Sequence, residues 1–188
     1  QDNLIQKVTK KQFEVIYEDK NILVVDKQPG LVVHTDNEGE VNTLINQVIN
    51  YLIEKKEYNP NQENSLVPSL VNRIDRNTAG LVLIAKNRQA LEILNEKFKT
   101  HEVRKFYLAE VIGHVNPKSK KAKAFLTKDK NKNEVIISQK PITRDSKEII
   151  TKYDVVKYLD RSTLVDIELF TGRTHQIRAH FNYLGYPL

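Results

Sequence analysis

Short runs of branched, aromatic and aliphatic residues, separated by turn residues, recur along most of this chain of 188 residues. Such runs are typical of β-strands, because these side chains pack well on a pleated surface. Turns join most of the runs, which favours antiparallel pairing over a doubly wound parallel sheet. The sequence therefore predicts an α+β fold with a mixed, largely antiparallel sheet and flanking helices. The expected strands are residues 13–18, 22–25, 31–33, 81–85, 105–111, 134–138, 148–158 and 163–170.

Three further segments carry apolar residues at the spacing of an amphipathic helix. Each follows a side chain that can accept a hydrogen bond from the free backbone N–H groups of the first turn. The expected caps are Asn42 or Thr43 for the first helix, Asn87 for the second and Thr174 for the third. Gly185 is expected to end the third helix, because glycine adopts the left-handed conformation that follows many helices.

Residues 118–132 form a lysine-rich stretch, with seven lysines and one aspartate. The composition predicts an exposed hairpin or loop. Such a run is usually a solvated surface, and contact with RNA is the alternative.

The charge balance favours a polyanionic partner. Lysine and arginine number 30 against 24 aspartates and glutamates, a net charge of +6. Nucleic acid is the first candidate for such a partner, and a merely soluble basic protein is the alternative. The chain has no cysteine, which excludes disulfides and thiolate catalysis. No apolar run has the length of a membrane span, so a cytoplasmic protein is expected.

Several classes of active site are not supported by the sequence. The five histidines form no helical metal-binding pair. There is no glycine-rich nucleotide loop, and no serine lies in a Gly-x-Ser-x-Gly elbow. We therefore expect neither a metal nor an organic cofactor.

The most informative polar segment holds Asp75 between Arg73 and Arg76, just before the predicted strand 81–85. A carboxylate beside several guanidinium groups stays ionised at neutral pH, which suits a nucleophile or a base. The arginines suit a substrate that carries phosphate. A rigid strand that supports a polar loop is a common way to present a catalytic group. The plainer alternative is a salt bridge or a helix cap, the role of most loop aspartates.

Two segments together resemble the signature of the RluA-type RNA pseudouridine synthases. Residues 71–80 read Val-Asn-Arg-Ile-Asp-Arg-Asn-Thr-Ala-Gly, and residues 172–178 read Gly-Arg-Thr-His-Gln-Ile-Arg. Residues 17–34 are similar to the opening strands of the family, 80–86 to its strand after the aspartate, and 105–111 to its tyrosine strand. Five separated motifs in the right order are a specific signal.

The chain departs from the family pattern at two positions. Asn72 stands where the family usually has histidine, and Ala79 stands where it has serine. Neither position carries the nucleophile. Asparagine can replace histidine as a hydrogen-bonding group, although it cannot be charged.

The resemblance implies a pseudouridine synthase fold with a central catalytic cleft, and it implies roles for single residues. Asp75 would be the nucleophile, Tyr107 would pack against the flipped uracil, and Arg178 would pair with the aspartate. Arg173 is the alternative partner of the aspartate. Residues implied to bind RNA or substrate are Arg73, Arg76, Lys105, Arg173 and Ile177. The plainer alternatives are a surface phosphate contact for Arg73, a core position for Tyr107 and helix packing for Ile177.

The implied activity is the conversion of specific uridines in structured RNA to pseudouridine, without a cofactor or a metal. Large-subunit (23S) ribosomal RNA is the expected substrate, and transfer RNA is the alternative. A non-catalytic RNA-binding or ribosome-assembly factor on the same fold is a second hypothesis, but it would not need Asp75, Tyr107 and Arg178 as a set. Hydrolysis of the glycosidic bond is a weaker hypothesis, because most glycosidases pair two carboxylates.

The resemblance also implies how the chain is organised. Residues 1–188 are expected to form one catalytic domain without an N-terminal S4-type RNA-binding domain. The chain starts at Gln1 and holds no methionine, and the family pattern continues past the last residue. We therefore expect the native protein to be longer. We also expect it to act as a monomer and to have RNA as its partner.

Overall fold

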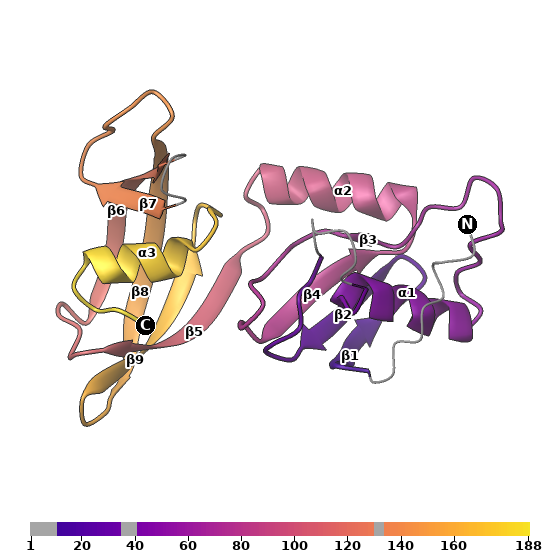
Figure 1. Cartoon of the computed structure of the whole chain (residues 1–188), viewed down its shortest axis with the longest axis horizontal. Coiled ribbons are helices and arrows are strands. Elements are labelled where there is room, and N and C mark those ends of the chain that lie inside the picture. The colour runs from indigo at the N-terminus through magenta and orange to yellow at the C-terminus, as the bar shows by residue number, and fades with distance from the viewer. Residues whose placement is uncertain (1–10, 35–40, 130–133) are drawn as a thin grey trace. The chain divides into compact units, whose positions relative to one another are not determined.

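The computed structural model describes residues 11–34, 41–129 and 134–188. It divides into two compact units, Gln1–Thr100 and His101–Leu188 (Figure 1). These are called the N-terminal unit and the C-terminal unit below. No helix in the described parts of the chain is long and apolar enough to cross a membrane.

The N-terminal unit is built on an antiparallel sheet with the strand order β1-β2-β4-β3. The elements are β1 (Phe13–Glu18), β2 (Ile22–Lys27), α1 (Leu44–Glu54), β3 (Ser69–Leu70), β4 (Gly80–Ala85) and α2 (Arg88–Lys99). The strands expected at 13–18, 22–25 and 81–85 are confirmed, whereas the short β3 was not expected. The core residues are Phe13, Leu23, Val25, Leu31, Val33, Leu44, Val48, Leu52, Val82 and Ile84.

The strand expected at residues 31–33 is absent, and this prediction was wrong. Val32 forms only an isolated parallel bridge with Thr43. The carbonyl of Val32 accepts from the N–H of Leu44 at 2.8 Å, and the next carbonyl accepts from the N–H of Ile45 at 3.2 Å. Leu31 and Val33 are buried because they pack in the core of the N-terminal unit, although their segment does not join the sheet.

Side-chain caps fix the starts of the first two helices. Of the two candidates for α1, Thr43 is the cap, because its hydroxyl accepts from the N–H of Asn46 at 3.3 Å. Asn87 caps α2 as expected, and its side chain accepts from the N–H of Ala90 at 2.9 Å. The periodicity of the apolar residues therefore placed both helices correctly.

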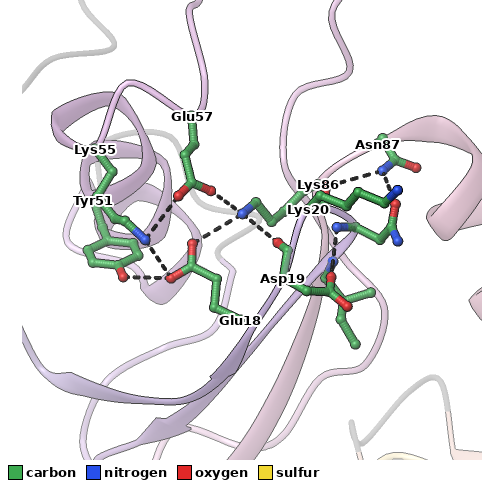
Figure 2. Close-up of polar contacts among 10 residues, drawn as sticks. Glu18, Asp19, Lys20, Tyr51, Lys55, Glu57, Lys86 and Asn87 are labelled. Atoms are coloured by element: carbon green, nitrogen blue, oxygen red, sulfur yellow. Dashed lines mark hydrogen bonds and ion pairs between the residues drawn. The ribbon is translucent and has the colours of Figure 1, made fainter.

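A ring of alternating charges joins β1 to the segments that follow α1 and β4 in the N-terminal unit (Figure 2). Glu18 accepts hydrogen bonds from Lys86 at 3.1 Å, from Lys55 at 2.8 Å and from the hydroxyl of Tyr51 at 2.8 Å. Glu57 closes the ring, because it pairs with Lys55 at 3.0 Å and also with Lys86. Burial alone would raise the pKa of Glu18, but these donors outweigh it and lower that pKa to about 2.

Loss of the Glu18 charge is expected to weaken the N-terminal unit. Because the pKa of Glu18 is lower in the folded than in the unfolded chain, its stabilisation is present above about pH 4.5 and is lost as the pH falls toward about 2. Glu18→Gln should lower the free energy of unfolding at pH 7 by about 1–2 kcal/mol. Urea unfolding across this pH range measures both effects. Glu14→Gln, at an exposed position on the same strand, is the control, and equal unfolding midpoints for the two variants would contradict the prediction.

The C-terminal unit is an antiparallel sheet with the order β5-β9-β8-β6-β7, and α3 packs on one of its faces (Figure 1). The elements are β5 (Lys105–Ile112), β6 (Ser119–Asp129), β7 (Glu134–Ser138), β8 (Lys147–Tyr158), β9 (Ser162–Leu169) and α3 (Gln176–Tyr183). The strands expected here are confirmed within a few residues at their ends. The core residues under the helix, called the α3 cluster, are Val111, Val115, Tyr153, Val165, Ile167, Leu169 and Phe181.

Most of the lysine-rich stretch is the long strand β6. The prediction of a hairpin holds for its pairing with β7, but the alternative of an exposed loop was wrong. Strand β6 also pairs with β8, so it has a neighbour on each side. Ala122 and Ala124 are buried, whereas Lys121 and Lys123 are exposed. This alternation with period two is the signature of a strand with one buried face. Lys130 and Lys132 lie outside the described residues.

Helix α3 starts one residue later than predicted. Its N-cap is His175, with a left-handed φ of 54° and no capping hydrogen bond from its side chain. Thr174 therefore does not cap the helix. The end of the helix is as expected, because Gly185 follows with a φ of +90°.

Candidate active site

The loop between β3 and β4 carries Asp75, and its first half is fastened to β4. The side-chain oxygen of Asn72 accepts from the N–H of Leu83 at 2.7 Å, and its amide donates to the carbonyl of Leu81 at 3.2 Å. Ile74 is partly buried against the core of the N-terminal unit. The residue that replaces the family histidine therefore anchors this loop.

The second half of the loop is held through the carbonyl of Arg76. This oxygen accepts from the N–H of Gly30 at 2.8 Å and from Nζ of Lys27 at 2.9 Å. Lys27 is fully buried, and it also donates to the carbonyls of Gln28 at 3.0 Å and Leu31 at 2.8 Å. Three carbonyl acceptors match the three donors of an ammonium group.

The charge of Asp75 reaches this buried lysine. Burial lowers the pKa of Lys27, the negative charge of Asp75 raises it, and the positive charge of Arg76 lowers it further. Lys27 thus contacts the backbone of the loop directly and interacts with Asp75 through charge.

The loop presents three charged side chains to solvent on a fixed backbone. Arg73, Asp75 and Arg76 are exposed, while Ile74 between them points into the core. A turn follows, in which the N–H of Thr78 donates to the carbonyl of Asp75 at 3.1 Å. The loop thus presents one carboxylate and two guanidinium groups from neighbouring positions, and guanidinium groups suit an anionic substrate.

The C-terminal unit holds the other predicted residues on the α3 side of its sheet. Lys105 and Tyr107 are half-buried at alternate positions of β5, so their side chains lie on the same face. Tyr107 and Ile177 both pack against the α3 cluster. The structure therefore brings the tyrosine of β5 and the apolar side of α3 together.

Arg173 and Arg178 lie on either side of the start of α3. Both are exposed, Arg173 in the loop after β9 and Arg178 in the first turn of the helix. Arg173 lies close enough to Lys105 for its charge to lower the pKa of that lysine, in addition to the larger effect of burial.

A buried polar network fixes the segment that bears these arginines. The side-chain oxygen of Gln176 accepts from the N–H of Arg173 at 3.1 Å and from the hydroxyl of Thr171 at 2.9 Å. Its amide donates to the hydroxyl of Thr151 at 3.1 Å, and Nδ1 of His180 hydrogen-bonds to the same hydroxyl at 2.8 Å. Burial lowers the pKa of His180 to about 4, so the ring is neutral at pH 7.

The predicted site residues thus form two groups. Arg73, Asp75 and Arg76 lie on one loop of the N-terminal unit, and Lys105, Tyr107, Arg173, Ile177 and Arg178 lie together in the C-terminal unit. The pairing of Asp75 with a basic residue of the C-terminal unit stays a prediction.

Sequence reasoning missed two residues that hold these groups in place. Lys27 follows Leu23 and Val25 at a spacing of two in β2, so the pattern placed a lysine at a core position and could have identified it. Gln176 gave no such signal, because its partners come from a strand 25 residues earlier as well as from its own loop.

Comparisons with known proteins agree with the motifs. A family model for RNA pseudouridylate synthase matches residues 21–183. The chain is 34% identical over 175 residues to the uncharacterized RNA pseudouridine synthase YlyB of Bacillus subtilis (strain 168), covering 93% of this chain and 55% of the relative. It is 31% identical over 175 residues to the ribosomal large subunit pseudouridine synthase D of Borreliella burgdorferi, covering 93% and 52%. The chain thus spans about half the length of these relatives.

A solved structure supports the fold. Human RNA pseudouridylate synthase domain containing 1 superposes with a TM-score of 0.75 at 22% identity, over 97% of this chain and 69% of that chain. The predicted α+β fold is confirmed. With the family model matching most of the residues, the chain belongs to the RNA pseudouridylate synthase family, as its RluA-type motifs predicted.

Proposed function

We propose that the protein isomerises specific uridines of large-subunit ribosomal RNA to pseudouridine. The observation that carries this proposal is the loop around Asp75, a carboxylate between two exposed arginines on a backbone anchored by Asn72 and Lys27. The name of the Borreliella relative, a ribosomal large subunit pseudouridine synthase, supports the choice of RNA. The net charge of +6 suits a polyanionic substrate.

The reaction requires access to a glycosidic bond inside folded RNA. The target uridine must first leave its stack, as in other enzymes that act on a base. Arg73 would fill the vacated space, because a guanidinium is planar, stacks on bases and binds phosphate. Tyr107 would stack on the extruded uracil, and Ile177 would form part of the apolar wall beside it.

The chemical step is an isomerisation with no net loss of atoms. Asp75 acts as the nucleophile and bonds to the nucleotide, at C1′ of the ribose or at C6 of the uracil, while the bond between C1′ and N1 of the uracil breaks. The bond to Asp75 is broken again before the product leaves. The uracil turns and C1′ joins C5, after which C5 loses its proton and N1 gains one. Tyr107 would take part in this proton transfer, and Arg178 would orient the Asp75 carboxylate.

The proposal is tested by mapping pseudouridine in cellular RNA. Ribosomal and transfer RNA from cells with and without the protein are compared by mass spectrometry after labelling of pseudouridine. Loss of one or a few sites in large-subunit ribosomal RNA is expected in cells that lack the protein. If sites are lost only from transfer RNA, the substrate is transfer RNA instead. Unchanged maps would contradict the proposal that the protein is an isomerase.

A further inference from the structure

Lys105 and Gly172 are in close contact in the C-terminal unit. In the β5–β9 pairing Lys105 lies opposite Leu169, which brings the first residue of β5 beside the loop that follows β9. A Cβ atom added at Gly172 would lie 3.0 Å from Nζ of Lys105. The backbone of Gly172 has no left-handed φ, so the small residue here makes room for the ammonium group.

Positive charge is concentrated at this contact. Arg173 is the next residue along the chain. Burial lowers the pKa of Lys105, and the positive charge of Arg173 lowers it further. In the described part of the chain, the Lys105 ammonium has no hydrogen bond and no ion pair. No aspartate or glutamate occurs from residue 169 to residue 188, and the first turn of α3 has no acidic residue.

Such an arrangement is unfavourable unless an anion binds. A half-buried ammonium loses part of its hydration, and a neighbouring guanidinium repels it. In most proteins a carboxylate compensates both effects, but the described residues place none here. A bound anion with several acceptor oxygens would satisfy the ammonium and the planar donors of the arginine at once.

We propose that Lys105 and Arg173, beside Gly172, bind one phosphodiester group of the RNA strand. The site lies on the α3 side of the sheet, two residues along β5 from Tyr107, a separation of about 6.6 Å between Cα atoms. It would hold the strand next to the position proposed for the extruded uracil. This inference rests on the proposed function, since it takes RNA as the source of the phosphate.

Three single variants test the site in the full chain. Lys105→Gln removes the ammonium and keeps hydrogen-bonding capacity. Gly172→Ala adds a methyl group that displaces the end of a flexible side chain, so the fold should be retained. Arg161→Gln, at a 95% exposed position in the same unit, is the matched control for loss of one positive charge.

The main measurement is the salt dependence of binding to a single-stranded RNA of about 20 nucleotides. Lys105→Gln should weaken binding about 10-fold near 100 mM salt and reduce the slope of log K against log[salt] by about 0.7. Gly172→Ala should weaken binding about 3-fold at the same melting temperature as the wild type. Arg161→Gln should leave affinity and slope within error of the wild type. An unchanged slope for Lys105→Gln, or an equal slope change in the control, would overturn the proposal.

Inorganic phosphate separates the two sources of the anion. NMR signals of the lysine Cε and Hε atoms, assigned with the Lys105→Gln variant, should shift on addition of phosphate in the millimolar range. A phosphate response together with an RNA slope that does not depend on Lys105 would indicate a site for free phosphate, against the proposal. Pseudouridine formation by the same wild-type protein is measured in parallel. Failure of that assay contradicts the proposed function, whereas an active enzyme with an unchanged Lys105→Gln slope contradicts only the phosphodiester site.

Discussion

Replacement of Asp75 by asparagine is expected to lower the rate of pseudouridine formation by about 10⁴-fold or more, as for loss of a covalent nucleophile. The change keeps the shape of the side chain but removes the anion that would attack the nucleotide. Because the side chain is exposed and the loop is anchored through other residues, the fold should be unaffected. Affinity for RNA should change by less than about threefold, since one reacting group adds little to an interface held by phosphate contacts.

The comparison requires a matched aspartate. Asp160 is a fully exposed loop residue in the C-terminal unit, and Asp160→Asn should isomerise uridine at the rate of the wild type. Single-turnover assays with the RNA identified by the pseudouridine map measure the chemical step, and filter binding measures affinity. Near-normal turnover by Asp75→Asn would disprove the proposed mechanism. If the wild type and the variant bind RNA equally but neither forms pseudouridine, the result would favour a non-catalytic RNA-binding factor.

Replacement of Lys27 by methionine is expected to lower the free energy of unfolding by about 3 kcal/mol. Methionine fills a similar volume, but it leaves the carbonyls of Gln28, Leu31 and Arg76 without their ammonium donor. Buried acceptors without a partner lose the hydration that they have in the unfolded chain. Arg76 retains its bond from Gly30, so the loop should loosen without detaching.

Urea unfolding of the purified chain, followed by circular dichroism, measures this loss of stability. Lys20→Met is the control, because Lys20 is exposed in the same unit and its replacement should change the unfolding free energy by less than about 0.5 kcal/mol. Equal midpoints for the two variants would show that the buried hydrogen bonds of Lys27 add little to stability.

The spacing of apolar residues along the chain was sufficient to predict most of the fold. Strands β1, β4 and β9 and both capped helices follow from the spacing of apolar residues and from single capping side chains. The errors occur where the deciding contact is distant. Residues 31–33 have the composition of a strand, but their carbonyls accept from the start of α1. The alternation of alanine and lysine in β6 was obscured by the excess of charge.

In the site, too, local sequence motifs were informative, whereas contacts between distant residues could not be predicted. Motifs predicted roles for Asp75, Tyr107 and the two arginines near α3, because reactive groups must be of a fixed chemical type. The residues that hold them were harder to find. Asn72 was noticed only as a departure from the family pattern, although its side chain joins the loop to β4. Nothing in the local sequence indicates which backbone groups a side chain will bind.

The hydrogen bond from Gly30 to the carbonyl of Arg76 joins residues 46 positions apart. The Asp75 loop therefore cannot take its final form before β2 and β4 have paired, and it should be among the later parts of the N-terminal unit to become ordered. The same bond makes the Gly30 amide a natural reporter. Its hydrogen-exchange rate measures how often the loop opens in the native protein. That rate can be followed while RNA is added, without altering any residue of the site.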